Sequence, residues 1–171
     1  MPARLLSTPP ISGSMPERQY EAVGACTWVE FDPADDVPWA GVFGHHGMSA
    51  HSGVFNFADD QLAFVIASGV GWIVDVDTGD LKLKTDQECL VTATAFDNMP
   101  FIAAADWTNI YIYSTDKLVW LSDRIALDGI RFEKAHNGTI KGRCWQPDGW
   151  YAFHIQTDPW QVVRDGFITS E

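Results

Sequence analysis

The strongest constraint on the fold is a repeated pattern of short apolar runs that are rich in β-branched and aromatic side chains. Three times, such a run leads into a threonine-centred turn, at Thr78, Thr115 and Thr157, and an apolar residue follows three positions later. These turns recur at intervals of about 40 residues, which is typical of repeated antiparallel hairpins. The sequence shows no amphipathic pattern long enough to predict a helix of about ten residues or more.

The middle repeat predicts one antiparallel sheet in which residues 101–106, 110–114 and 118–122 pair, preceded by a strand within 90–96. Asn137 and Gly138 predict a two-residue hairpin turn in the last repeat, because both tolerate positive φ. Three units of four strands are expected, together with a degenerate fourth unit. The remaining units are expected over 54–81, 130–160 and, for the degenerate one, 20–44.

A four-stranded meander with two apolar faces must stack against another sheet to bury both of them. The sequence therefore predicts an all-β fold of antiparallel four-stranded meanders, arranged as a small or partial β-propeller-like structure, with a β-sandwich as the alternative. Residues 1–18, rich in Pro and Ser, are expected to be a flexible tail before a single domain over 19–171 of about three and a half to four repeats. An open propeller would leave a face available for a second copy, so a dimer is compatible with this pattern.

The segment from Asp75 to Leu81, read Asp-Val-Asp-Thr-Gly-Asp-Leu, resembles the outer hairpin of β-propeller repeats of the quinone-protein and WD40 type. The resemblance extends over roughly 54–165 and implies blade-like repeats. A second stretch, Trp120 to Ile130, resembles a segment of small uncharacterised bacterial proteins and implies no activity.

Charge restricts the class of partner. With 11 Lys and Arg against 23 Asp and Glu, the formal net charge is −12. A protein that binds nucleic acid needs a basic face, and an acidic surface is repelled by anionic membranes. Neither class of partner is therefore expected, whereas a basic protein is compatible with this charge.

The three cysteines, Cys26, Cys89 and Cys144, are widely spaced and form no CxxC pair, which favours reduced thiols over a disulfide framework. No run approaches the roughly 18 apolar residues of a transmembrane helix. The first 15 residues lack the apolar core of a signal peptide. Together these features predict a cytoplasmic protein.

Two neighbouring turns carry aromatic and polar residues at equivalent ends of successive repeats. Such loops converge on one face in a blade-like fold, so we expect an aromatic, acidic recognition patch there. The competing interpretation is that these aromatic residues pack between sheets. The candidate binding residues are Asp106, Trp107, Asn109, Tyr111, Trp150 and Tyr151.

Other residues with chemical potential form weaker patterns. A loop with three histidines offers imidazole ligands for zinc or copper, but no nearby carboxylate or thiol completes a site. A DxD segment lacks the ligand spacing of an EF-hand and reads equally as a capped hairpin turn. Paired aspartates are expected to solvate turns. The three histidines are His45, His46 and His51, and the aspartates of the DxD segment are Asp75, Asp77 and Asp80. The paired aspartates are Asp35-Asp36 and Asp59-Asp60.

Nucleophilic catalysis would require Cys144 to approach His136 or His154, which the sequence does not enforce. No phosphate-binding glycine loop is present, and no cofactor, metal site or catalytic residue is predicted. The sequence favours a non-enzymatic binding protein, of the kind that bacterial immunity proteins represent, which neutralises a basic partner or toxin. The alternative is an enzyme or small-ligand binder that uses the loops at the blade ends, with or without a metal.

Overall fold

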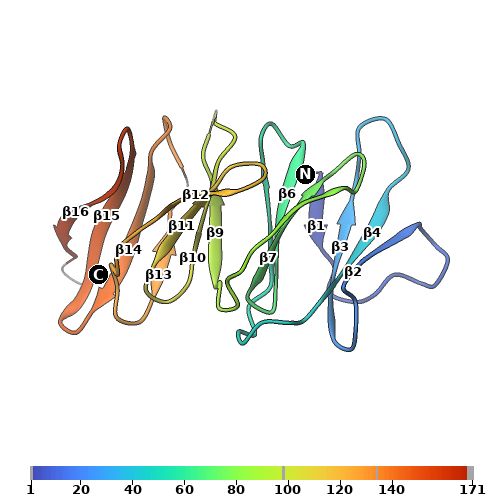
Figure 1. The fold of residues 1–171 in the computed structure, drawn as a ribbon, viewed down its shortest axis with the longest axis horizontal. Coiled ribbons are helices and arrows are strands. Elements are labelled where there is room, and N and C mark those ends of the chain that lie inside the picture. Colours follow the sequence, from blue (N-terminus) through green and yellow to red (C-terminus); the bar gives the residue numbers. More distant parts are fainter. Residues whose placement is uncertain (1, 98, 134, 169–171) are drawn as a thin grey trace. The chain divides into compact units, whose positions relative to one another are not determined.

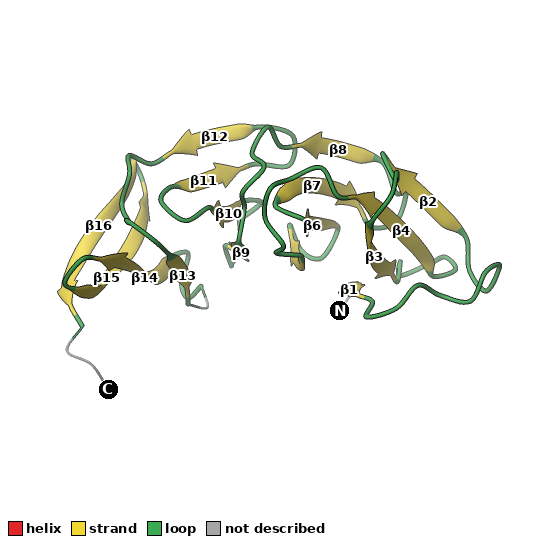
Figure 2. Cartoon of the chain, turned by 90° about the horizontal axis from the view of Figure 1, so that it is seen from below, coloured by secondary structure: helices red, strands yellow, loops and turns green. Residues whose placement is uncertain are grey.

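The computed structural model describes residues 2–97, 99–133 and 135–168, and every regular element within these ranges is a β-strand (Figure 2). No helix in the described part of the chain is therefore long and apolar enough to cross a membrane. The strands form four sheets of four strands each, and none of these sheets closes on itself. This confirms the predicted all-β fold of repeated four-stranded sheets.

The chain divides into two compact units, residues 1–90 and 91–171. Each unit contains two of the four sheets (Figure 1). The boundary falls immediately after Leu90, between the second and third sheets.

The first sheet of unit 1 differs from the predicted meander. It consists of β1 (Ala3–Leu5), β2 (Glu17–Tyr20), β3 (Cys26–Phe31) and β4 (Trp39–Gly44), in the order β1-β3-β4-β2. The β3–β4 hairpin forms the centre, β1 pairs antiparallel with β3, and β2 pairs parallel with β4. Strands β1 and β2 therefore occupy the two edges of this sheet.

Residues 3–5 and 17–20 thus belong to the sheet rather than to the flexible tail expected over 1–18. Ala3 is completely buried against the core, and the guanidinium group of Arg4 binds both carboxylate oxygens of Glu30 at 2.9 Å. The amide of Leu6 donates to the carbonyl of Trp28 at 2.9 Å. These two strands are hard to recognise in the sequence, because each is short and a Pro- and Ser-rich segment separates them.

The second sheet of unit 1 is a regular antiparallel meander. Its strands are β5 (Gly53–Phe57), β6 (Leu62–Ala67), β7 (Val70–Asp75) and β8 (Leu81–Lys84), in chain order. Every residue of β6 is buried, so this strand is covered on both faces. A strand buried on both faces loses the apolar–polar alternation and reads as a continuous apolar run.

Aromatic side chains fill the core between the two sheets of unit 1. Phe31 stacks on Trp39 with ring centroids 4.0 Å apart, and Tyr20 stacks on Phe43 at 4.6 Å. Trp72, fully buried, lies 5.9 Å from Phe43. Large aromatic rings account for much of the apolar area that strands this short can bury.

Unit 2 contains two antiparallel meanders. Strands β10 (Ile102–Ala105), β11 (Ile110–Tyr113) and β12 (Leu118–Leu121) pair as predicted, with Ile102 opposite Tyr113 and Ile112 opposite Trp120. Asn137 and Gly138 both have positive φ, between His136 and Thr139, which confirms the two-residue turn. The strands are β9 (Thr92–Ala95), β10 (Ile102–Ala105), β11 (Ile110–Tyr113) and β12 (Leu118–Leu121), followed by β13 (Ile130–Phe132), β14 (Ile140–Gln146), β15 (Gly149–Thr157) and β16 (Trp160–Phe167).

The buried hydroxyl of Tyr20 in unit 1 should make the free energy of unfolding decrease at alkaline pH. Tyr20 is 8 % exposed, and its hydroxyl donates to the carbonyl of Gly79 at 2.6 Å. Burial raises the pKa of Tyr20 to about 12. Because the fold favours the neutral phenol, its contribution is complete below pH 10, the ordinary pKa, and is lost as the pH rises through 12.

Between pH 10 and pH 12, the free energy of unfolding of the wild type should therefore fall by about 2 kcal/mol more than that of Tyr20→Phe. Urea titrations across this range measure the difference, and the phenylalanine variant subtracts the effect of all other groups. Parallel pH profiles for the two proteins would contradict this assignment.

Candidate functional site

One end of unit 1 carries many acidic side chains, because the turns β3–β4, β5–β6 and β7–β8 lie side by side there (upper edge in Figure 1). These turns contain seven exposed aspartates, which we call the acidic end. Its members are Asp32, Asp35, Asp36, Asp59, Asp60, Asp77 and Asp80.

Two hydrogen bonds at Val76 connect these three turns. The amide of Val76 donates to the carbonyl of Gln61, and the indole Nε1 of Trp39 donates to the carbonyl of Val76, both at 3.0 Å. Val76 and Trp39 are buried, so these bonds lie beneath the charged surface. The carboxylates are therefore carried by a fixed frame, although each of them is exposed.

The β5–β6 turn has an unusual backbone. Ala58, Asp59 and Asp60 have φ values of 52°, 53° and 66°, three successive residues in the left-handed region. Residues with a Cβ rarely adopt this conformation, although Asp does so more readily than most. The turn directs two adjacent carboxylates into solvent at the cost of some backbone strain.

The β7–β8 turn is closed by its own first aspartate. Oδ1 of Asp75 accepts hydrogen bonds from the amides of Asp77 and Thr78, at 3.2 and 2.9 Å. Burial opposes ionisation of Asp75, but the bonds from Thr78 and the nearby ammonium group of Lys82 outweigh it, so its pKa is lowered. Asp75 therefore caps this hairpin turn through its Oδ1.

The cations at the acidic end neutralise only part of its charge. Lys82 forms ion pairs with Asp75 at 3.4 Å and with Asp80 at 3.8 Å. The guanidinium group of Arg18 lies 5.1 Å from the ring of Trp39 and donates to the carbonyl of Thr78. The surface that remains is strongly negative.

An apolar side chain lies among these carboxylates. Val37, in the β3–β4 turn, is 65 % exposed and follows Asp35 and Asp36 directly. Protein interfaces commonly combine an apolar contact with a charged surround. The acidic end thus offers an apolar contact residue in addition to the negative electrostatic field of its carboxylates.

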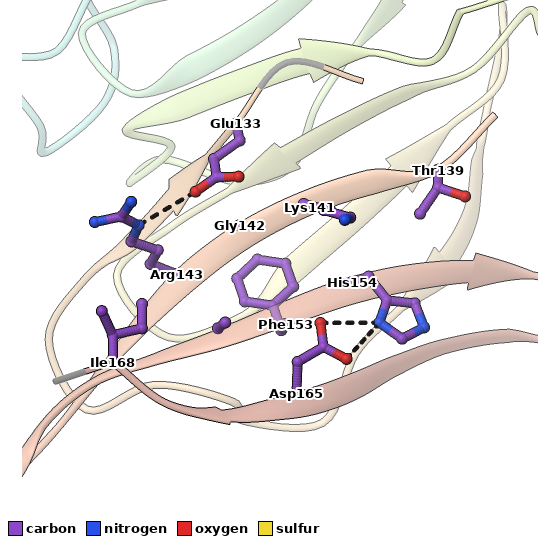
Figure 3. Close-up of a pocket in the computed structure, with 10 residues that line it drawn as sticks. Glu133, Thr139, Lys141, Gly142, Arg143, Phe153, His154, Asp165 and Ile168 are labelled. Carbon is purple, nitrogen blue, oxygen red and sulfur yellow. Dashed lines mark hydrogen bonds and ion pairs between the residues drawn. The ribbon is translucent and has the colours of Figure 1, made fainter. Parts of the chain in front are cut away.

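A second candidate is a groove on the C-terminal sheet, with a volume of about 730 Å³ (Figure 3). Charged and polar side chains, among them Lys141, Arg143, His154 and Asp165, contribute to its lining. Its lining residues are Glu133, Thr139, Lys141, Gly142, Arg143, Ala152, Phe153, His154, Asp165 and Ile168.

Two ion pairs lie in this C-terminal groove. Nδ1 of His154 lies 2.8 Å from Oδ1 of Asp165, and Nε of Arg143 lies 3.2 Å from Oε1 of Glu133 (Figure 3). An imidazole oriented by a carboxylate can act as a general base when a nucleophile is within reach. Cys144 is buried on the opposite face of β14, so the hypothetical Cys–His pair is not assembled here.

The six sequence-predicted binding residues fall into separate environments. Oδ1 of Asp106 accepts hydrogen bonds from the amides of Thr108 and Asn109, at 2.6 and 2.7 Å, and its Oδ2 accepts the hydroxyl of Tyr111 at 2.8 Å. Nδ2 of Asn109 donates to the carbonyl of Ser122 at 3.0 Å. Asp106, Asn109 and Tyr111 therefore organise the β10–β11 turn and attach the segment that follows β12.

Trp107 lies within the same turn, where its carbonyl accepts the amide of Gly129 at 2.8 Å, whereas Trp150 and Tyr151 lie on β15. Trp107 is 43 % exposed. Trp150 and Tyr151 are adjacent in β15 and point to opposite faces of the sheet: the guanidinium group of Arg131 lies 4.8 Å from the ring of Trp150, whereas Tyr151 packs against the core of unit 2. The alternation of side chains along a strand separates the two aromatics.

The imidazoles of His45 and His46 in the histidine loop contact different partners. Nε2 of His45 lies 2.9 Å from the hydroxyl of Thr27, and Nε2 of His46 lies 2.9 Å from the carbonyl of Glu21. Among the described residues, no three His, Cys, Asp or Glu side chains are grouped to hold a metal ion.

Sequence reasoning assigned the paired aspartates to turns but did not bring those turns together. The order of the turns could have predicted that they meet, because the first and third turns of a four-stranded meander lie at the same end of the sheet. Asp59-Asp60 and Asp77 occupy those two turns of the second sheet.

Comparisons with known proteins add no relative. No family profile, curated protein or solved structure matches the chain.

Proposed function

We propose that this protein is a non-enzymatic binding protein whose acidic end receives a basic protein partner. The observation that carries the proposal is the assembly of seven exposed aspartates from three turns on one fixed end of unit 1. Binding to a basic surface would relieve repulsion among these carboxylates.

The physical consequence of such an end is fast, salt-sensitive association. A surface with one sign of charge attracts an oppositely charged partner over roughly one Debye length, about 10 Å at 0.1 M salt. Charge of this kind mainly raises the association rate and selects the sign of the partner. Val37 supplies an apolar contact once the surfaces meet.

The finer parts of the proposal rest on the sequence. The role is that of an immunity-type protein which neutralises a basic toxin in the bacterial cytoplasm, where free Cys26, Cys89 and Cys144 would stay reduced. The blade-like sheets are proposed to be diverged repeats of the quinone-protein or WD40 kind, on the strength of the turn from Asp75 to Leu81.

The test is binding of a small basic protein, lysozyme, measured by calorimetry at about 20 and about 150 mM salt. One variant replaces Asp35, Asp36, Asp59 and Asp60 by asparagine. We expect this variant to bind about tenfold more weakly at low salt, and the wild type to lose affinity as salt rises.

The matched control removes the same charge elsewhere, by asparagine at four exposed aspartates outside the acidic end: Asp86, Asp116, Asp128 and Asp158. Its affinity should stay within about twofold of wild type at equal salt, because distant charges are screened. Equal weakening in both variants would reduce the effect to net charge and overturn the proposal, as would a wild type that does not bind at low salt.

A further inference from the structure

A groove in unit 2 differs in chemistry from both surfaces described above. It lies where β12 faces the start of β16, has a volume of about 360 Å³, and contains two tryptophans, Trp120 and Trp160. Asp123 contributes a carboxylate, and among the described residues that line the groove none is cationic. We call it the tryptophan groove.

The carboxylate is held in a defined place. Ser122, immediately before Asp123, is buried, and its Oγ accepts the amide of Ile110 at 2.8 Å. On the other side, the amide of Ile125 donates to the carbonyl of Thr108 at 2.9 Å. The backbone is thus fixed on both sides of Asp123, while its side chain is exposed.

The aromatic part of the groove is equally well supported. Trp160 packs edge-to-face on Phe96 and Phe101, with centroids 5.5 and 5.3 Å apart. Trp120 is half-buried and packs against the core of unit 2. Neither indole has to be ordered when a ligand binds, which lowers the entropic cost of binding.

The protein's own arginines near this segment are already engaged. Nε of Arg124 donates to the carbonyl of Ala126 at 3.1 Å, and Nη2 of Arg164 donates to the carbonyl of Ile125 at 3.2 Å. These contacts hold both guanidinium groups on backbone oxygens. The carboxylate of Asp123 is left to an external cation.

From this geometry we propose that the tryptophan groove binds a guanidinium or alkylammonium group, supplied by an arginine or lysine side chain of the basic partner. Indole rings attract cations through their π electrons, and a carboxylate beside them adds a charge-assisted hydrogen bond. The C-terminal groove does not suit this role, because Lys141 and Arg143 line it. The inference rests on the proposed function, but it names a separate contact.

The test uses a hexa-arginine peptide, with calorimetry at about 20 mM salt. Asp123→Asn should weaken binding about fivefold, because the ion pair and its effect on the stacked cation are lost together. Asp128→Asn, an equal change of charge at an exposed position of the same segment, should alter affinity by less than about twofold. Nuclear magnetic resonance should show the indole N–H signals of Trp120 and Trp160 shifting with peptide in the wild type.

The outcomes separate this inference from the proposed function. Equal affinities for Asp123→Asn and Asp128→Asn, or shifts confined to other tryptophans, would overturn the groove assignment. If the acidic-end variant loses affinity for lysozyme while Asp123→Asn keeps its affinity for the peptide, the proposed function stands and the groove fails. The reverse pattern retains the groove and rejects the acidic end.

The free polyamine spermine carries the same alkylammonium chemistry and is tested in parallel. Weaker binding of spermine than of the peptide, with little dependence on Asp123, supports a protein side chain as the ligand. Binding of spermine at least as tight as that of the peptide, with the same loss in Asp123→Asn, would assign the groove to a free polyamine and overturn the side-chain assignment.

Discussion

Replacement of Trp72 by alanine is expected to lower the free energy of unfolding by about 3–5 kcal/mol, the usual cost of removing a large buried aromatic side chain. Trp72 is fully buried between the two sheets of unit 1, 5.9 Å from Phe43 and 6.5 Å from Tyr20. The ammonium group of Lys84 lies 5.0 Å from its ring. Alanine would leave a cavity that these rings cannot fill without moving.

A phenylalanine at the same position provides the matched comparison. The indole Nε1 of Trp72 is buried and has no hydrogen-bond acceptor among the described residues. Phenylalanine removes this unsatisfied donor, which offsets part of the lost packing, so Trp72→Phe should cost only about 1 kcal/mol. Urea unfolding measures both variants, and equal destabilisation by phenylalanine and alanine would contradict this account of the indole.

The second large effect is expected at Asp106. Its carboxylate accepts hydrogen bonds from two amides of the β10–β11 turn and from the hydroxyl groups of Thr108 and Tyr111. Asp106→Ala removes all of these acceptors and leaves partly buried donors unpaired, which should lower the free energy of unfolding by about 2–3 kcal/mol.

Asparagine tests whether Asp106 serves the fold or a ligand. Asp106→Asn keeps one oxygen that can accept the turn amides, so it should recover most of the stability lost in Asp106→Ala, as measured by urea unfolding. Its affinity for lysozyme should equal that of the wild type. A stable Asp106→Asn protein with weakened binding would restore Asp106 to the recognition surface and contradict its structural role.

The meanders were predictable because their signals are local. Apolar runs, turn residues and Asn137-Gly138 each act within one hairpin, so the register of β10 with β11 follows from adjacent segments. The first sheet was not predictable in this way. Pairing of Tyr20 with Phe43 is parallel and joins segments that are not consecutive in the chain, and no local turn specifies it.

The candidate surfaces show the same limit. Trp150 and Tyr151 read as one patch in sequence, yet a strand directs neighbouring side chains to opposite faces. Asp59 and Asp77 are far apart in sequence, yet their turns meet through Val76. The sequence did not identify Asp123 as a candidate binding residue, because its place beside a tryptophan groove depends on Trp160 from another sheet. Chemistry that arises from the packing of sheets is visible only once the sheets are placed.

The order β1-β3-β4-β2 has a consequence for the route of folding. The edge strands of this sheet precede its central hairpin in the chain, so neither can complete its pairing until that hairpin exists. A meander closes short loops one after another, whereas this sheet requires two longer closures around a preformed centre, and non-local closures slow folding. The first sheet is therefore expected to be the last of the four to acquire its full set of strands, even though its residues are synthesised before those of the other three sheets.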